Sequence, residues 1–180
     1  MTSSPDSNAI LDEADMEAAI TRMAVSIMAQ SHCTSPLAVV GLLSRGDIIA
    51  RRLARQLEEA GIPVSFGSID ISLYRDDIFQ LETKPSLRST NLPFSTDDMR
   101  IVLVDDVLNT GRTIRAALNA IFDYGRPACI ELAALIDRGG REVPIQPDHV
   151  GYVMPDSGEK IRVLLKESDG TDLVTRQHQH

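Results

Sequence analysis

Cysteine is scarce in this sequence, and it does not occur in a metal-binding pattern. The two cysteines are Cys33 and Cys129, and neither belongs to a CxxC pair or an evenly spaced set. A structural zinc site and a disulfide framework are therefore not expected, and free thiols in a reducing cytoplasm are the default prediction. His178 and His180 end a polar segment, which predicts disordered residues rather than metal ligands.

Long apolar runs are also missing. No stretch approaches the roughly 20 apolar residues that a membrane span requires, and the N-terminus MTSSPDSNAILDEADM lacks the basic and apolar regions of a secretion signal. The sequence contains neither GxxxxGK[ST] nor GxGxxG, which excludes the common nucleoside-triphosphate and dinucleotide motifs. A cytoplasmic protein without membrane contact is expected.

Basic residues are fewer than acidic residues in this sequence. Lys and Arg number 18 against 26 Asp and Glu, for a net charge of −8. This balance does not suit a surface that follows nucleic acid over its whole length, although a local basic patch is compatible with it. With 180 residues, 43% hydrophobic and 24% charged, the chain has the composition of one ordinary globular domain.

Apolar periodicity predicts alternating helices and strands. Helices are expected near residues 16–28, 47–60 and 112–124, and strands at 37–43, 64–74, 100–104 and 128–136, with two later strand-like segments, VGYVM and KIRVLLKE. The predicted fold class is α/β, with a mostly parallel central sheet flanked by helices. Residues 74–98 lack periodicity and predict a flexible loop or hairpin excursion. We expect a disordered leader at 1–9, a single domain at 10–168 and a polar tail at 169–180.

Three polar turns follow predicted strands, at 44–47, 105–113 and 137–141. Ligands of parallel sheets bind outside the carboxyl ends of the strands, so these turns are expected to share one binding edge.

The second of these turns has an unusual composition. Asp105 and Asp106 stand side by side at the end of an apolar run, and a Thr-Gly-Arg-Thr turn then opens a helix. Free backbone N–H groups and the helix dipole attract a phosphate at such a turn. The two carboxylates are suited instead to a sugar diol or to Mg²⁺ held through water. A pentose with a phosphate, a diol and a metal-bound diphosphate would satisfy both halves, whereas an acidic pair by itself would more often simply end a strand.

The segment VLVDDVLNTGRT resembles the phosphoribosyl-pyrophosphate (PRPP) signature of type I phosphoribosyltransferases. Together with GLLSRGDIIARRLA, IDISLYRDD and GRPACIELAALIDRGGRE, it is similar to the PyrR family of pyrimidine-operon regulators with uracil phosphoribosyltransferase activity. The resemblance covers most of residues 10–165. It implies a type I phosphoribosyltransferase fold, the reaction of uracil with PRPP to UMP and pyrophosphate, Mg²⁺ as cofactor, and a homodimer or higher homo-oligomer.

The resemblance also implies residue roles. Asp105, Asp106 and Arg45 are the catalytic candidates, with Mg²⁺ held by the substrate and by one of the aspartates through water. The Ser44–Arg45–Gly46 turn matches the pyrophosphate loop, in which family members often have a non-proline cis peptide. The full set of expected PRPP-binding residues is Ser44, Arg45, Gly46, Val104, Asp105, Asp106, Val107, Leu108, Asn109, Thr110, Gly111, Arg112 and Thr113.

Two further segments match the family. Asp137 and Arg138 lie where the family builds its uracil pocket, although a glycine-rich turn that merely ends a strand has the same composition. Tyr74, Arg75, Asp76 and Asp77 resemble the flexible active-site loop, although a solvated turn would look alike. Asn109 cannot act as a carboxylate base, so no general base is assigned.

RNA binding is the weaker implication. Thr21, Arg22, Arg138 and Arg141 match positions that could contact a messenger-RNA stem-loop, but Val25 and Gly140 stand where the family often has histidine, and Leu43 where a lysine is frequent. We therefore rank enzyme above RNA regulator. The alternatives are a non-catalytic RNA-binding attenuator that senses UMP or PRPP, and a transferase for another base.

Overall fold

The computed structural model describes residues 8–30, 32–72, 90–154 and 158–177. Along the chain, the strands and helices are β1 (Ala9–Leu11), α1 (Glu13–Ala29), β2 (Leu37–Leu42), α2 (Gly46–Glu59), β3 (Val64–Ile69), β4 (Arg100–Leu108), α3 (Arg112–Phe122), β5 (Cys129–Asp137), β6 (His149–Val153), β7 (Lys160–Leu164), α4 (Lys166–Asp169) and β8 (Leu173–Gln177). None of these helices is long and apolar enough to cross a membrane.

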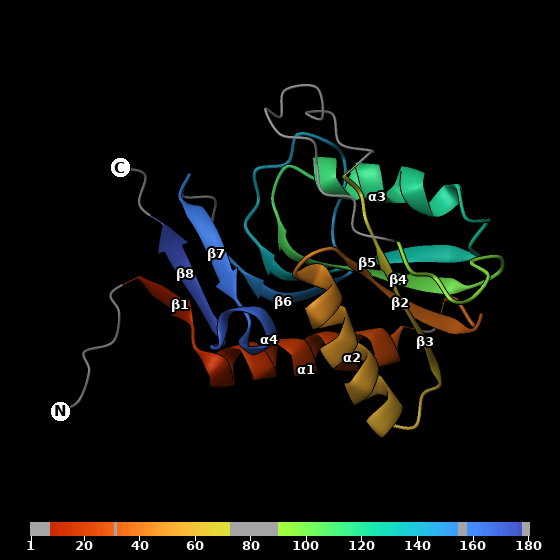
Figure 1. Cartoon of the computed structure of the whole chain (residues 1–180), viewed down its shortest axis with the longest axis horizontal. Coiled ribbons are helices and arrows are strands. Elements are labelled where there is room, and N and C mark those ends of the chain that lie inside the picture. The colour runs from red at the N-terminus through yellow and green to blue at the C-terminus, as the bar shows by residue number, and fades with distance from the viewer. Residues whose placement is uncertain (1–7, 31, 73–89, 155–157, 178–180) are drawn as a thin grey trace.

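A five-stranded sheet in the order β3-β2-β4-β5-β6 forms the centre, and all its neighbouring strands are parallel (Figure 1). Gly41 pairs with Val104, and Leu108 pairs with Asp137. The turns that follow β2, β4 and β5 therefore lie at one edge, as the sequence predicted. The predicted α/β class with a parallel central sheet is confirmed.

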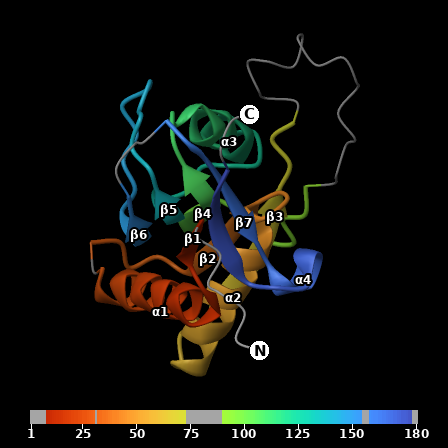
Figure 2. The same cartoon turned by 90° about the vertical axis from the view of Figure 1, so that its left-hand side faces the viewer.

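Alternate residues of the central strands face two separate cores. Val39, Val102 and Val104 join the core beneath α1 and α2, whereas Val40 and Leu103 join the core beneath α3. Successive side chains of a strand point to opposite faces, so strands covered on both faces are apolar throughout. Helices α1 and α2 cover one face of the sheet and α3 covers the other (Figures 1 and 2).

A second, antiparallel sheet in the order β1-β8-β7 was not predicted. Val163 of β7 and Val174 of β8 are buried in the core beneath α1 and α2, as is Leu165, which directly follows β7. The expected boundaries are corrected here, because β8 lies within the supposed tail and β1 begins at Ala9, within the supposed leader. Pairing with distant strands orders segments that are too short and polar to signal a strand by themselves.

Two further expectations were wrong. β4 continues to Leu108 instead of ending at residue 104, because its backbone pairs with β5 as far as Asp137. Cys33 and Cys129 form a disulfide rather than free thiols, since the fold brings two positions 96 residues apart to a Cα–Cα distance of 6.8 Å. Of the expected excursion, residues 73–89 lie outside the described residues. Its far end returns to the sheet through a bridge between Asn91 and Ser68.

Candidate active site

The turn between β2 and α2 is packed directly against the end of β4. A Cβ atom at Gly46 would lie 2.5 Å from the carbonyl oxygen of Val104 and 3.2 Å from Asp105 Cα, so only glycine allows this approach. At Gly41 a Cβ atom would come within 2.3 Å of Asp47 Cα. The two glycines therefore bring the turn that carries Arg45 beside the acidic pair.

Asp105 and Asp106 lie in the last part of β4. Asp105 is buried, and desolvation together with the neighbouring charge of Asp106 raises its pKa well above the usual value. Burial also raises the pKa of Asp106, while the amide of Val107 and the charge of Arg45 act in the opposite direction. The pair is thus a concentrated, poorly solvated negative site that a hydroxyl donor or a cation would stabilise.

Local hydrogen bonds hold the two carboxylates in place. The amide of Asp106 donates to Asp105 Oδ1 at 3.0 Å, and the amide of Val107 donates to Asp106 Oδ1 at 2.9 Å. One oxygen of each carboxylate is fixed by a backbone amide in this way.

The N-terminus of α3 has the features of a phosphate site. Gly111 adopts φ +85° as the N-cap residue and has no side chain to cap the first turn. Thr110 Oγ1 accepts from the Arg112 amide at a long 3.3 Å, and Thr113 is exposed. An anion can reach these backbone amides at the positive end of the helix dipole.

Arg45 is the N-cap residue of α2, directly after a cis peptide bond between Leu43 and Ser44. Its Nη2 lies 3.3 Å from Asp169 Oδ1, and its buried Nε has no hydrogen-bond partner among the described residues. Asp169 was missed from the sequence because nothing in ESDGTD distinguishes it from a solvated acidic turn.

The turn after β5 is held together by Arg141. Its guanidinium donates to the carbonyl oxygens of Ile145, Asn109 and Gly139 and to Asp137 Oδ1, at 2.7–3.2 Å. Arg141, a candidate RNA contact, is thus engaged within this turn. Asp137 and Arg138 lie beside Leu108, whose carbonyl oxygen accepts from the Arg138 amide at 3.1 Å. The expected base-binding turn therefore adjoins the acidic strand.

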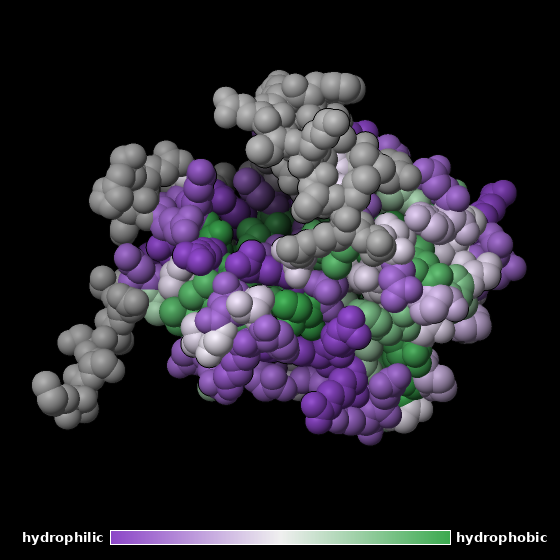
Figure 3. Space-filling view, viewed as in Figure 1, coloured by the Kyte–Doolittle hydropathy of each residue, from purple (hydrophilic) through white to green (hydrophobic). Residues whose placement is uncertain are grey.

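The remaining expected RNA contacts lie on α1, outside this edge. Arg22 donates to the carbonyl oxygen of Gly151 at 2.7 Å, and Thr21 donates to that of Glu17 at 3.0 Å. Tyr74, Arg75, Asp76 and Asp77 lie outside the described residues. The surface is hollowed between the β7–β8 hairpin and α3, with hydrophilic and hydrophobic residues around the recess (Figure 3).

A second cluster lies near the opposite edge of the sheet. His32, Cys129 and Glu131 place potential metal-ligand atoms within 4.8 Å of one another. Cys129 is, however, disulfide-bonded, and Glu131 accepts from Arg100 and contacts His149 at 2.8 Å. A cavity of about 620 Å³ lined by Cys33 and Arg100 adjoins this cluster. Neither feature belongs to the edge that carries the acidic pair.

Comparisons with known proteins agree with this arrangement. Residues 6–160 match the family model of the phosphoribosyl transferase domain. The chain is 65% identical to the Bifunctional protein PyrR of Akkermansia muciniphila, over 94% of this chain and 96% of that protein. It is 47% identical to the Bifunctional protein PyrR of Deinococcus radiodurans, over 92% and 91%. The hypoxanthine phosphoribosyltransferase of Trypanosoma cruzi in complex with the product IMP has the same fold, with a TM-score of 0.71, 19% identity and coverage of 98% and 97%. The chain therefore belongs to the PyrR family of phosphoribosyltransferase-domain proteins.

Proposed function

We propose that the protein is a uracil phosphoribosyltransferase, which converts uracil and PRPP to UMP and pyrophosphate. The observation that carries the proposal is the meeting, at one sheet edge, of a buried acidic pair, an open helix N-terminus and an arginine-bearing turn. The names of its PyrR relatives favour a pyrimidine substrate, whereas the Trypanosoma enzyme, at 19% identity, supports the fold alone.

In the proposed complex each part of PRPP has its own partner. Asp105 and Asp106 accept hydrogen bonds from the ribose hydroxyls, and the amides and hydroxyls of Thr110–Thr113 bind the 5-phosphate. Ser44, Arg45 and Gly46 bind the diphosphate. Uracil lies against the turn of Asp137 and Arg138, which follows β5 and adjoins β4.

The donor set also fits Mg²⁺, a hard cation that prefers oxygen ligands and usually retains several waters. Asp105 or Asp106 would hold it through water, and when bound with PRPP it supplies positive charge against the leaving diphosphate. The bond between C1 and the diphosphate oxygen breaks as uracil N1 bonds to C1, and the proton of uracil N1 is released to water. Arg45 stabilises the departing anion, and the acidic pair stabilises the positive charge that develops on the ribose. We assign no general base, because Asn109 has no carboxylate.

Regulation of pyrimidine genes through UMP-dependent messenger-RNA binding is the second proposed activity. It rests on the word bifunctional in the relatives' names and on the retained Thr21, Arg22 and Arg138. A purely non-catalytic sensor is less favoured, because the acidic pair, Arg45 and the open helix N-terminus at one edge of the sheet support a transferase. We further propose a homodimer or higher homo-oligomer, on the family resemblance.

The proposal is tested with purified protein, PRPP, Mg²⁺ and each nucleobase in turn, with pyrophosphate release as the readout. We expect kcat/KM for uracil to exceed that for hypoxanthine or guanine by about 100-fold or more, because a pocket built to hydrogen-bond one base rejects a poorly paired one. Equal turnover of a purine would contradict the base assignment. Absence of turnover with every base, together with intact UMP binding, would favour the sensor.

A further inference from the structure

Arg45 is held by an acid from a distant part of the chain. Asp169, the last residue of α4, accepts from Arg45 Nη2 at 3.3 Å, and the two side chains are 17% and 33% exposed. The pair joins residues 124 apart in sequence. Arg45 also interacts electrostatically with a second acid, Asp106, because its positive charge lowers the pKa of that carboxyl group.

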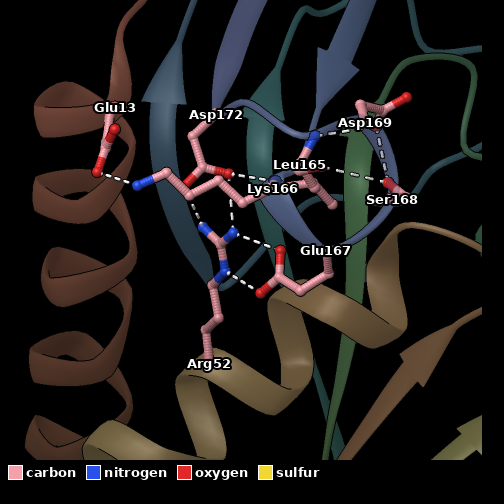
Figure 4. Close-up of polar contacts among 8 residues, drawn as sticks. All are labelled: Glu13, Arg52, Leu165, Lys166, Glu167, Ser168, Asp169 and Asp172. Atoms are coloured by element: carbon pink, nitrogen blue, oxygen red, sulfur yellow. Dashed lines mark hydrogen bonds and ion pairs between the residues drawn. The ribbon is translucent and has the colours of Figure 1, made fainter.

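Asp169 is itself fixed by its own helix. Its Oδ2 accepts from the Leu165 amide at 3.0 Å and from Ser168 Oγ at 2.7 Å (Figure 4). The Leu165 amide, the Ser168 hydroxyl and Arg45 lower the pKa of Asp169, so its carboxylate is ionised at neutral pH. One carboxylate oxygen is therefore used for anchoring, and the other is directed to Arg45.

Helix α4 is in turn clamped to α2 and α1. Arg52 of α2 forms paired hydrogen bonds with Glu167 at 2.9 and 2.6 Å and with Asp172 at 3.0 and 2.8 Å, and Lys166 pairs with Glu13 of α1 (Figure 4). Bidentate arginine–carboxylate pairs fix direction as well as distance. Arg45 and Arg52 lie seven residues apart, on the same side of α2, so α4 contacts both arginines at once.

We infer that Asp169 is a positioning residue for PRPP: its anchored carboxylate orients the Arg45 guanidinium, so that the remaining N–H groups can bind the diphosphate. The inference rests on the proposed role of Arg45 in the diphosphate site. Only one nitrogen of the guanidinium is engaged by Asp169, and the buried Nε has no partner among the described residues. An arginine held in one geometry loses less side-chain freedom when the substrate binds.

Asp169→Asn is the test. The side-chain amide oxygen of the introduced asparagine can replace Oδ2 as the acceptor for the Leu165 amide and the Ser168 hydroxyl. Its NH₂ group then faces the Arg45 guanidinium, and because both groups are donors, no hydrogen bond can form between them. We expect KM for PRPP to rise about five- to tenfold, the loss typical of one charged hydrogen bond. KM for uracil and the melting temperature should stay close to those of the unmodified protein. Glu167→Gln is the matched control, because it removes the same charge from the same helix without contact to Arg45, and Asp172 still holds Arg52.

A double-mutant cycle with Arg45→Ala separates the possible failures. If Asp169 acts through Arg45, Asp169→Asn should add nothing in the Arg45→Ala background. If the single variant Arg45→Ala binds PRPP weakly but the single variant Asp169→Asn binds it normally, the positioning role of Asp169 is overturned. The proposed role of Arg45 would remain. Tighter PRPP binding in Asp169→Asn would also overturn it, because the carboxylate would then compete with the diphosphate. Normal PRPP binding by Arg45→Ala would remove Arg45 from the proposed site, and the role of Asp169 with it.

Discussion

Adjacent carboxylates inside a sheet are unfavourable for folding, and their presence at Asp105 and Asp106 has to be explained by function. Burial and mutual repulsion both disfavour the ionised form of Asp105. A ligand that donates hydroxyl groups or brings a cation relieves this repulsion. The destabilised acidic pair is thus consistent with a site whose partner is the substrate.

Replacing Asp105 tests whether the acidic pair destabilises the folded protein. Asp105→Asn should raise the melting temperature at pH 8 by about 2–4 °C, the shift for roughly 1 kcal/mol in a chain of this size, while abolishing pyrophosphate release. Because folding raises the pKa of Asp105, the folded state binds the proton more tightly than the unfolded state. Stability is therefore lost as pH rises from about 4 through the raised pKa.

Thermal melts at pH 5 and pH 8 measure this effect. The advantage of the variant in melting temperature should be smaller at pH 5, because pH 5 is closer to the usual pKa of a carboxyl group and less of the stability has been lost there. Asp106→Asn should also raise the melting temperature, but by less. The Val107 amide and the charge of Arg45 offset part of the effect that burial has on the pKa of Asp106. A variant less stable than the unmodified protein at both pH values would show that the carboxylate supports the fold.

Two turns at the binding edge, the one after β5 and the one before α3, contain glycines with positive φ angles. Gly139 and Gly140 adopt φ +71° and +72° in succession, which disfavours any side chain there. A histidine at position 140 would be strained in this left-handed conformation. Gly111 adopts φ +85°, and a Cβ atom there would also lie 2.7 Å from Val143 Cγ2.

Gly111→Ala is therefore predicted to lower both stability and PRPP affinity. We expect the melting temperature to fall by about 4 °C or more, from roughly 1–2 kcal/mol of left-handed strain and the added contact, and KM for PRPP to rise at least about tenfold, because the displaced amides no longer meet the 5-phosphate. Gly61→Ala is a matched control: Gly61 has the same φ of +85° but nothing within 4 Å of its Cβ position. It should lose stability without change in KM. Equal kinetic effects of the two variants would contradict a phosphate site at α3.

At the scale of the whole molecule, the net charge of −8 limits RNA binding. The fold also uses two of the candidate arginines internally, since Arg22 donates to Gly151 and Arg141 closes the turn after β5. Val25, where the family often has a cationic or donor side chain, is 55% exposed and apolar. Fewer of the candidate RNA-binding side chains are therefore available to neutralise phosphates.

Pyrimidine-leader RNA is accordingly predicted to bind weakly, with a Kd above about 1 µM at physiological salt, the range of non-specific binding. Fluorescence anisotropy over a salt series, with and without UMP, measures both affinity and the number of phosphate contacts. A scrambled stem-loop of equal length is the control. Nanomolar, salt-sensitive and UMP-enhanced binding would reverse our ranking of enzyme over regulator.

Four features could be predicted from the amino-acid sequence: the α/β class, the main helices, the common edge of the three turns, and the acidic pair with its TGRT turn. These features follow from apolar periodicity and from short motifs, which are local properties of the chain. Four other features became visible only in the folded chain: the full length of β4, the β1-β8-β7 sheet, the Cys33–Cys129 disulfide and the pairing of Arg45 with Asp169. Each depends on which distant segments become neighbours. Hydrogen-bond partners a hundred residues apart leave no signal in a local pattern.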